Sequence, residues 1–322
     1  MCALFGWLDY KHKIQHKVLK KLTQALANAA EERGTDASGI SYISNGKVKI
    51  YKRPKPAHKV RFSFPVGTSA VMGHTRMTTQ GDEMHNYNNH PFEGHGDKYF
   101  AFAHNGVLYN DKVLRDKMGL PETHIETDSY VAVQLIEKYG KLNFDSLKLM
   151  AEEVSGSFTF TALDEHNKLY FVKGSNPIRI ICIESLGLYI YASTNTILSE
   201  ALSKLGLKLK HFTEVPVDEG ELMSINCNGR IERSNFDYCD IDYFRYPYYR
   251  GSRYMTEDEQ ELWLLETCNS FGVDEDTVLM LLEFGYTADE IEEMFMDDDL
   301  LQRCLSDINE IDIFEEAYEL PI

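Results

Sequence analysis

The sequence lacks any hydrophobic run that could cross a membrane and any cysteine pattern typical of a disulfide framework or a zinc site. No stretch approaches the roughly 18 uncharged apolar residues of a membrane helix, and the opening residues lack the basic segment of a secretory signal. The six cysteines are scattered without a CxxC pair. We therefore expect a cytoplasmic protein, in which Cys182 and Cys227 pack as small hydrophobic residues of apolar, strand-like stretches.

Phosphate-binding and metal-binding motifs are also missing. Neither GxxxxGK[ST] nor GxGxxG occurs, which argues against a nucleotide-dependent domain in this chain. His85, His90 and His95 recur every five residues, but the sequence has no helical carboxylate–histidine spacing that would complete a metal site. We expect neither a metal nor a cofactor.

The excess of negative charge is confined to the end of the chain. Residues 257–322 hold 22 acidic residues and a single arginine, a net charge of −21, so residues 1–256 carry +3 of the total of −18. Such an acidic segment argues against nucleic acid and anionic membranes as partners. It favours a basic protein partner or a solubilising role.

The hydrophobic pattern predicts an α+β protein. Apolar residues recur at helical spacing over 14–33, and Ser44-Asn45-Gly46 supplies a turn between two alternating strands over 40–52. Apolar runs that break into polar loops follow at 69–76 and 99–106, helices at 128–139 and 145–153, and three strand–turn–strand units at 157–173, 178–193 and 220–234.

The whole sequence divides into three predicted segments. A domain at 2–235 is followed by a Tyr-rich linker at 236–255, which docks on it, and by an acidic helical module at 256–322. Capping-box patterns mark the module, at Thr256-x-x-Glu259 and Thr287-x-x-Glu290. Gly285 stands where a helix C-cap belongs.

A thiol stands at the second position of the chain. If the initiator methionine is removed, Cys2 carries both a free α-amine and a nucleophilic thiol. Five polar loop sequences follow in order: RGTDASG (33–39), GHTRMTTQGD (73–82), NNHPF (88–92), AHNGVLYN (103–110) and ETDSYV (126–131). Each motif alone is weak evidence for a functional site, whereas all five in this order after Cys2 are specific evidence for one.

Together these motifs resemble the class II glutamine amidotransferase domain, an N-terminal-nucleophile hydrolase. The resemblance covers about the first 235 residues, and its matching positions are Cys2, Phe5, Gly6, Arg33, Gly34, Asp36, Gly39, His74, Arg76, Thr78, Thr79, Asn88, His90, Pro91, His104, Asn105, Gly106 and Asp128. It implies a four-layer αββα sandwich, followed here by a small all-α module.

The resemblance also implies the chemistry of a glutaminase. Cys2 would attack the side-chain amide of glutamine, forming a γ-glutamyl thioester and releasing ammonia, with Asn105 and Gly106 as oxyanion donors. The substrate-binding residues would be Arg76 for the α-carboxylate and Asp128 for the α-ammonium, with Thr79 and Gln80 beside them. His74 and His104 are expected to satisfy backbone groups of the loops.

Some residues depart from the family pattern without removing a catalytic part. Ala3 replaces a usual glycine, Met77 a frequent aromatic residue and Tyr130 a frequent glutamate. Family members usually carry a second, ammonia-using domain, for which about 85 residues after 236 leave no room. We therefore expect the acceptor enzyme to be a separate chain that docks on the acidic tail.

Two alternatives stay open. The same fold could hydrolyse another γ-glutamyl compound or small amide, although Arg76 and Asp128 suit a free amino acid. The chain could also be an inactive scaffold that binds a partner through its tail, against which the intact Cys2, Asn105 and Gly106 argue.

Overall fold

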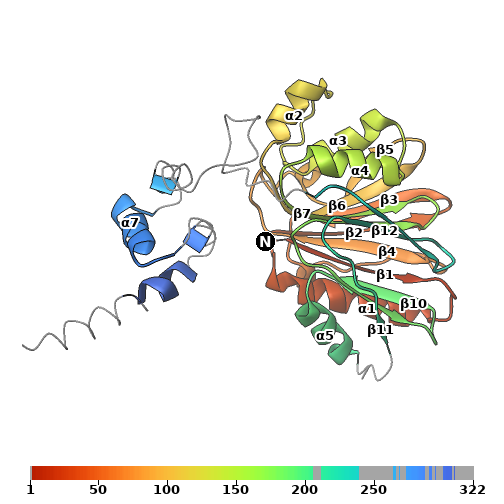
Figure 1. Cartoon of the computed structure of the whole chain (residues 1–322). Helices are drawn as coiled ribbons and strands as arrows, with labels where there is room; N and C mark the ends of the chain where they lie inside the picture. The colour runs from red at the N-terminus through yellow and green to blue at the C-terminus, as the bar shows by residue number, and fades with distance from the viewer. Residues whose placement is uncertain are drawn as a thin grey trace, which may run out of the picture. The chain divides into compact units, whose positions relative to one another are not determined.

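Two antiparallel β-sheets face each other in the first part of the chain, as the computed structural model in Figure 1 shows. The first sheet has the strand order β11-β9-β10-β1-β4-β2-β3, and the second β13-β12-β8-β7-β6-β5. The strands of the first sheet are β1 (Ala3–Asp9), β2 (Ala37–Ser44), β3 (Lys47–Arg53), β4 (Ala70–Arg76), β9 (Arg179–Ile183), β10 (Leu188–Ala192) and β11 (Thr213–Glu214). Those of the second are β5 (Phe92–His95), β6 (Tyr99–Leu108), β7 (Gly156–Asp164), β8 (Leu169–Lys173), β12 (Glu221–Ile225) and β13 (Ile231–Asn235).

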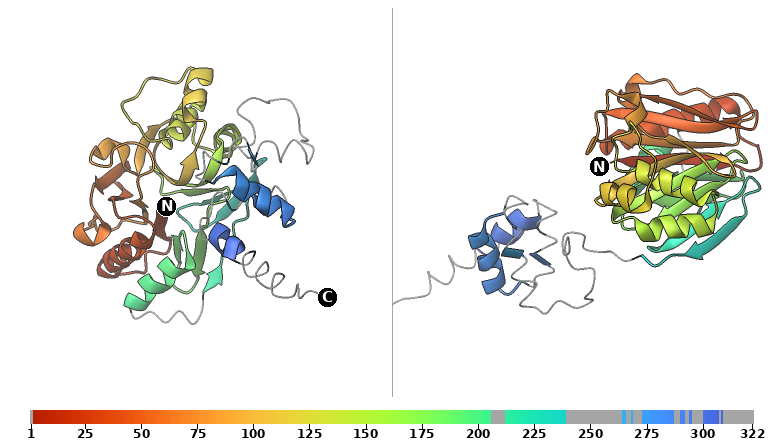
Figure 2. Two further views of the ribbon diagram at one scale, coloured as in Figure 1. Left: turned by 90° about the vertical axis from the view of Figure 1, so that its left-hand side faces the viewer. Right: turned by 90° about the horizontal axis from the view of Figure 1, so that it is seen from above.

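Helices cover the outer face of each sheet. On the first sheet lie α1 (His16–Ala29) and α5 (Asn195–Lys204), which Figure 2 shows side by side. Over the second sheet lie α2 (Asp111–Met118), α3 (Tyr130–Tyr139) and α4 (Phe144–Glu153). Short 3-10 helices are η1 (Ala30–Glu32), η2 (Ala57–Lys59) and η3 (Asn86–Asn88). The predicted α+β class and αββα sandwich are confirmed.

The structure describes residues 2–205 and 212–238, and further along residues 264–265, 268, 273–286, 290–291, 294, 300–306 and 308. The chain divides into two units, Met1–Tyr243 and Phe244–Ile322. The domain boundaries drawn from the sequence remain predictions. Most of the predicted linker, and both capping-box threonines of the acidic module, lie outside the described residues.

Local sequence signals explain several elements. Asn45 and Gly46 have φ angles of 52° and 68°, which a two-residue type I′ hairpin requires, and they place Ser44 opposite Lys47 in the β2–β3 pair. The helix expected at 14–33 forms as α1 and continues as η1. The three strand–turn–strand units form as β7–β8, β9–β10 and β12–β13, as predicted.

Other elements differ from the prediction. The motifs GHTR and AHNG remain inside β4 and β6 where loops were expected. The first pairs with β1 and β2 on its two sides, and the second pairs with β7. Helices α2 and α5 were not predicted. Cys227 is exposed in the turn between β12 and β13, so its predicted packing as a small core residue is wrong, whereas Cys182 is buried.

Strand β1 lies in the middle of its sheet, between β4 and β10, and is buried on both faces because helices cover one side and the second sheet covers the other. Phe5 and Trp7 pack toward α1 and α5, whereas Leu4 and Leu8 pack between the two sheets. A continuous apolar run is the pattern that such a two-sided strand requires. The position of β1 fixes where residue 2 must lie.

The second unit is helical where it is described. In α7 (Glu275–Glu283) the Asp274 carboxylate caps the first turn by accepting the backbone N–H of Thr277 at 2.9 Å. Gly285 follows the helix with a φ of 99°, which confirms the predicted C-cap. The second unit has an apolar cluster of its own, formed by Leu264, Cys268, Val273, Val278, Leu281, Ile291, Met294, Leu301 and Ile308. Within the described ranges of both units, no helix is long and apolar enough to span a bilayer.

The packing between the sheets predicts a large cost for removing one core side chain. Leu163 is fully buried between the sheets, whereas Leu149 on α4 is 47% exposed. Leu163→Ala should lower the free energy of unfolding by about 2–5 kcal/mol, and the control Leu149→Ala by less than about 0.5 kcal/mol. Urea denaturation measures both, and equal effects would contradict the two-sheet core.

Candidate active site

The layer between the two sheets changes from apolar to polar at one end. Successive side chains of a strand point to opposite faces, so Cys2 lies on the same face of its segment as Leu4 and Leu8. By the same alternation His74 and Arg76 follow Met72 on β4, and Asn105 follows Ala103 on β6; Met72 and Ala103 also pack between the sheets. The polar side chains that the motifs singled out therefore meet at this end.

Cys2 is held from several directions. Its carbonyl accepts the Nε–H of Arg33 at 2.8 Å, and its thiol donates to the carbonyl of Met77 at 3.5 Å. Burial raises the pKa of the Cys2 thiol, whereas the bond to Met77 and the positive charge of Arg76 act against this rise. The buried thiol therefore needs a base to become a thiolate.

The segment at 33–36 braces the chain opposite Cys2. A Cβ on Gly34 would lie 2.4 Å from the carbonyl carbon of Arg76, so only glycine allows this approach. The Asp36 carboxylate accepts the backbone N–H of Thr78 at 2.7 Å. Sequence reasoning matched this motif but assigned it no role; the structure shows that it fixes the position of residues 76–78.

Arg76 is buried and holds the loop that follows β4. Its Nη1 donates to Oδ1 of Asn89 at 2.7 Å, and its Nη2 donates to the carbonyls of Gln80, at 2.5 Å, and Gly81, at 3.0 Å. Three of the five N–H groups of the guanidinium are thus bound to protein oxygens. Sequence reasoning missed the contribution of Asn89, which only the folded loop brings to Arg76.

Asn105 and Gly106 are consecutive residues of β6. Both amide atoms of the Asn105 side chain are buried without a hydrogen-bond partner among the described residues. Gly106 has a φ of 143°, and a Cβ there would lie 1.9 Å from the carbonyl oxygen of Ser157. His74 donates from Nε2 to the carbonyl of His104 at 2.8 Å, which holds the strand just before Asn105.

Three histidines pack behind these residues. The rings of His74 and His90 stack with centroids 4.2 Å apart, and Nδ1 of His104 accepts the hydroxyl of Ser129 at 2.8 Å. Burial lowers the pKa of His74 to about 3 and lowers the pKa values of His90 and His104 as well. Neutral imidazoles that bond to backbone and hydroxyl groups confirm the structural role expected for His74 and His104.

The other histidines of the five-residue pattern do not join them. His85 and His95 are exposed, and His90 is buried. In the described part of the chain, no three His, Cys, Asp or Glu side chains are arranged to hold a metal ion.

Asp128 lies just before α3 and reaches back to β6. Its Oδ2 accepts the backbone N–H of Leu108 at 2.6 Å, and its Oδ1 lies 3.4 Å from the hydroxyl of Ser129. The positive charge of Arg76 lowers the pKa of the Cys2 thiol, and the negative charge of Asp128 raises it. Arg76 and Asp128 thus lie near enough to the thiol for their charges to affect its pKa.

The two other predicted substrate-binding residues lie farther along the loop after β4. Thr79 is exposed, and Nε2 of Gln80 donates to the carbonyl of Glu126 at 3.0 Å. Gln80 thus connects its loop to the segment before Asp128 through its side chain, while its own carbonyl accepts from Arg76. Their role toward a substrate stays a prediction.

Known proteins share this domain. Residues 74–198 match the profile of a family described as "Glutamine amidotransferase domain". The glutamine–fructose-6-phosphate aminotransferase (isomerizing) of Geobacillus kaustophilus is 27% identical over 270 residues, which cover 77% of this chain and 42% of that protein. The 7-cyano-7-deazaguanine synthase 2 of Sulfurisphaera tokodaii is 27% identical over 235 residues, which cover 68% of this chain and 49% of that protein.

Solved structures agree in fold. The glutamine phosphoribosylpyrophosphate amidotransferase from B. subtilis superimposes with a TM-score of 0.56 at 20% identity, covering 73% of this chain and 49% of that one. Residues 74–198 thus match a glutamine amidotransferase domain, in agreement with the resemblance seen in the motifs, and the shared fold extends over 73% of the chain. The chain spans about half, or less, of the length of the relatives that it matches.

The neutral histidines predict a loss of stability in mild acid. An unfolded histidine binds a proton below about pH 6.5 and the buried one does not, so stability is complete above that pH and falls as the pH falls, by about 1.4 kcal/mol per unit for each proton. His90→Leu removes one such group without removing a hydrogen bond to a described residue. Urea unfolding between pH 6 and pH 5 should show a slope smaller by about 1.4 kcal/mol per unit.

His166→Leu, which removes an exposed histidine, is the matched control for this measurement. If His90→Leu and the wild type lost stability equally between pH 6 and pH 5, the buried imidazole of His90 would be protonated in the folded protein, contrary to its surroundings.

Proposed function

We propose that this protein hydrolyses glutamine to glutamate and ammonia through a γ-glutamyl thioester on Cys2. The observation that best supports this proposal is the buried side-chain amide of Asn105, which has no hydrogen-bond partner among the described residues. It lies at the end of the sandwich that also holds the Cys2 thiol. A buried amide with no partner costs free energy unless a ligand completes it. A developing oxyanion is such a ligand for its N–H groups.

In the proposed reaction, removal of Met1 leaves Cys2 with an α-amine whose ordinary pKa is about 7.7–8.0. This amine takes the thiol proton, and sulfur attacks the side-chain carbonyl carbon of glutamine. The carbonyl oxygen becomes an anion that accepts from Asn105 and from the backbone N–H of Gly106. When the C–N bond breaks, the amine returns the proton and ammonia leaves. Water then cleaves the thioester to glutamate.

Arg76 and Asp128 supply the charges that a free amino acid needs. The α-carboxylate of glutamine pairs with the guanidinium and its α-ammonium with the carboxylate, assignments supported by the action of both charges on the Cys2 thiol. Thr79 and Gln80 border the same loop. Because Arg76 also holds that loop through three hydrogen bonds, it both binds the substrate and keeps its site ordered.

The ammonia acceptor is proposed to be a separate enzyme. The acidic segment at 257–322, with its net charge of −21, is the proposed docking site for that enzyme. The cytoplasm as the place of action stays a prediction from the sequence.

The function is tested by incubating the purified protein with glutamine and measuring ammonia and glutamate. Cys2→Ala should abolish release while leaving the thermal unfolding midpoint within a few degrees of the wild type. The intact mass of the active protein should correspond to a chain that begins at Cys2. Activity in a protein that still retains Met1 would contradict the α-amine as base, and activity in Cys2→Ala would exclude the thioester.

The oxyanion role of Asn105 is a separate prediction. Asn105→Ala should lower kcat by about 10²–10³ and leave KM nearly unchanged, because the amide binds the transition state more tightly than the substrate. Asn228→Ala, in an exposed turn, is the control and should keep full activity. A change in KM alone would assign Asn105 to substrate binding instead.

A further inference from the structure

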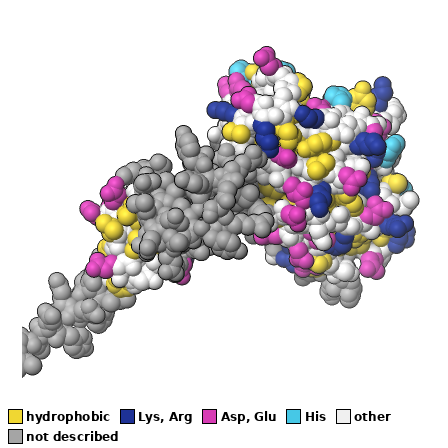
Figure 3. Space-filling model, turned by 45° about the horizontal axis from the view of Figure 1, so that its top comes forward, with side chains coloured by type: hydrophobic (Ala, Val, Ile, Leu, Met, Phe, Trp, Pro, Cys, Tyr) yellow, Lys and Arg dark blue, Asp and Glu magenta, His cyan; other side chains and the backbone are white. Residues whose placement is uncertain are grey.

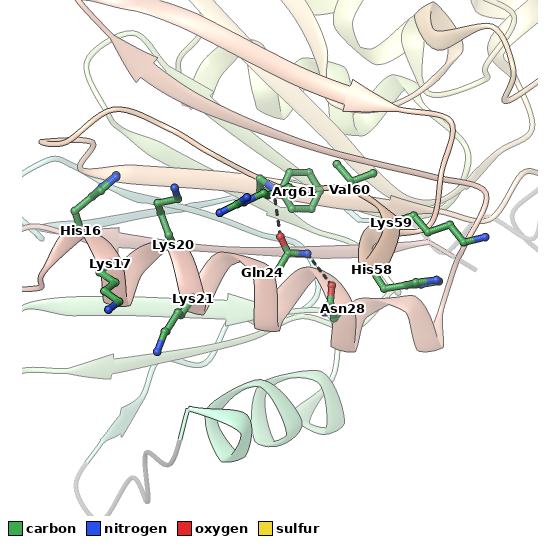
Figure 4. Close-up of a pocket in the computed structure, with 11 residues that line it drawn as sticks. His16, Lys17, Lys20, Lys21, Gln24, Asn28, His58, Lys59, Val60 and Arg61 are labelled. Atoms are coloured by element: carbon green, nitrogen blue, oxygen red, sulfur yellow. Dashed lines mark hydrogen bonds between the residues drawn. The ribbon is translucent and has the colours of Figure 1, made fainter.

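A groove of about 630 Å³ lies on the outer side of the first sheet, between α1 and the segment that includes η2. Figure 4 shows the side chains of α1 along one side and those of the segment at 58–62 along the other. From His16 to Asn28 the helix rises about 18 Å. The groove therefore has the length of about six residues of extended chain.

Basic side chains line both sides of this groove. Lys17, Lys20 and Lys21 lie on α1, and Lys59 and Arg61 lie on the opposite segment. All except the half-buried Lys20 are exposed, and none of the five forms an ion pair with another residue that the structure describes. The groove presents five cations that the described protein does not neutralise.

The sequence around the groove excludes acidic residues. Residues 10–30 and 37–81 contain no Asp or Glu, although both segments are rich in lysine and arginine. Between them, Glu31 accepts from the backbone N–H and Nδ1 of His58. By contrast, the face in Figure 3, which includes the helices over the second sheet, mixes acidic and basic side chains.

This charge arrangement disfavours the isolated helix. The N-terminal turn of a helix favours negative charge because of the macrodipole, yet α1 begins with His16 and Lys17 and has no acidic residue in that turn. Lys17 and Lys21 also repel each other at i, i+4 spacing. Local preferences broken in this way are expected at functional surfaces.

The floor of the groove is held in place. The side chain of Gln24 donates to Oδ1 of Asn28 at 2.9 Å and to the carbonyl of Ala57 at 3.1 Å, and it accepts the backbone N–H of Phe62 at 3.3 Å. These bonds fasten the 57–62 segment to α1. One of these bonds occupies the backbone N–H of Phe62, which a compact phosphate site could otherwise use. The groove is left with flexible cations on its two sides.

We propose that this groove docks an acidic segment of a partner protein. Three cations on α1 lie across the groove from two on the opposite segment, and such a divided set suits carboxylates spaced along an extended peptide better than a single phosphate. Among the described residues that line the groove there is no exposed Phe, Tyr or Trp for base stacking, since Phe62 is buried, so single-stranded nucleic acid is a poorer match. Binding at this surface does not require glutaminase activity.

The test uses the full chain and a fluorescein-labelled 12-residue peptide of alternating glutamate and alanine. Fluorescence anisotropy at 50 and 200 mM NaCl should show saturable binding that weakens with salt. Lys17→Glu/Lys21→Glu should weaken binding by about tenfold or more, and Lys17→Arg/Lys21→Arg should retain it. The control, Lys112→Glu/Lys141→Glu, makes the same change in net charge on exposed lysines elsewhere and should retain binding.

Several results would overturn the proposal. An equal loss of peptide binding in the control variant Lys112→Glu/Lys141→Glu would show that only the net charge of the protein matters. Tripolyphosphate or a 12-nucleotide single-stranded DNA could also bind more tightly than the peptide. If Lys17→Glu/Lys21→Glu abolished that binding, the groove would be assigned to phosphates. Carbodiimide cross-links from Lys17 or Lys21 to residues 257–322 in the free protein would show that the chain occupies its own groove. Ammonia release in the Lys17→Glu/Lys21→Glu variant should equal that of the wild type.

Discussion

The burial of β1 on both faces is the constraint on which the site depends. A strand packed against helices on one side and a second sheet on the other cannot slide by one residue, because a slip would turn Phe5 and Trp7 into the space of Leu4 and Leu8. The residue before this strand takes its position from the strand. Cys2 therefore needs no dedicated scaffold, and the contacts from Arg33 and Met77 only orient it.

The polar end of the sandwich is ordered by groups that do not touch the reacting atoms in the proposed reaction. His74 holds the backbone before Asn105, the 33–36 segment holds the backbone after Arg76, and Asp128 holds Leu108 at the end of β6. Each of these contacts joins two strands or loops that are distant in sequence. The candidate catalytic atoms thus inherit their positions from buried backbone contacts, which is the arrangement that preorganised electrostatic stabilisation requires.

Much of this could be predicted from the sequence, for identifiable reasons. The hairpin at Asn45-Gly46 and the core face of α1 are local signals, and ordered motifs identify the family even when each is weak alone. Pairing partners are not local. The segments that hold His74 and Asn105 look like loops because they are polar, and only pairing with neighbouring strands keeps them extended. The bond from Arg76 to Asn89 and the exposure of Cys227 depend on the folded path of the chain, which no residue pattern specified.

The bonds of Arg76 to its loop have a thermodynamic consequence. One guanidinium takes part in two equilibria, the ordering of residues 80–89 and the proposed binding of a carboxylate, so the two are linked and each must favour the other if both use the same geometry. Occupancy of the pocket then appears as protection of backbone amides in a loop that the ligand need not touch. The loop becomes a reporter of the site, readable by hydrogen exchange without any measurement of turnover.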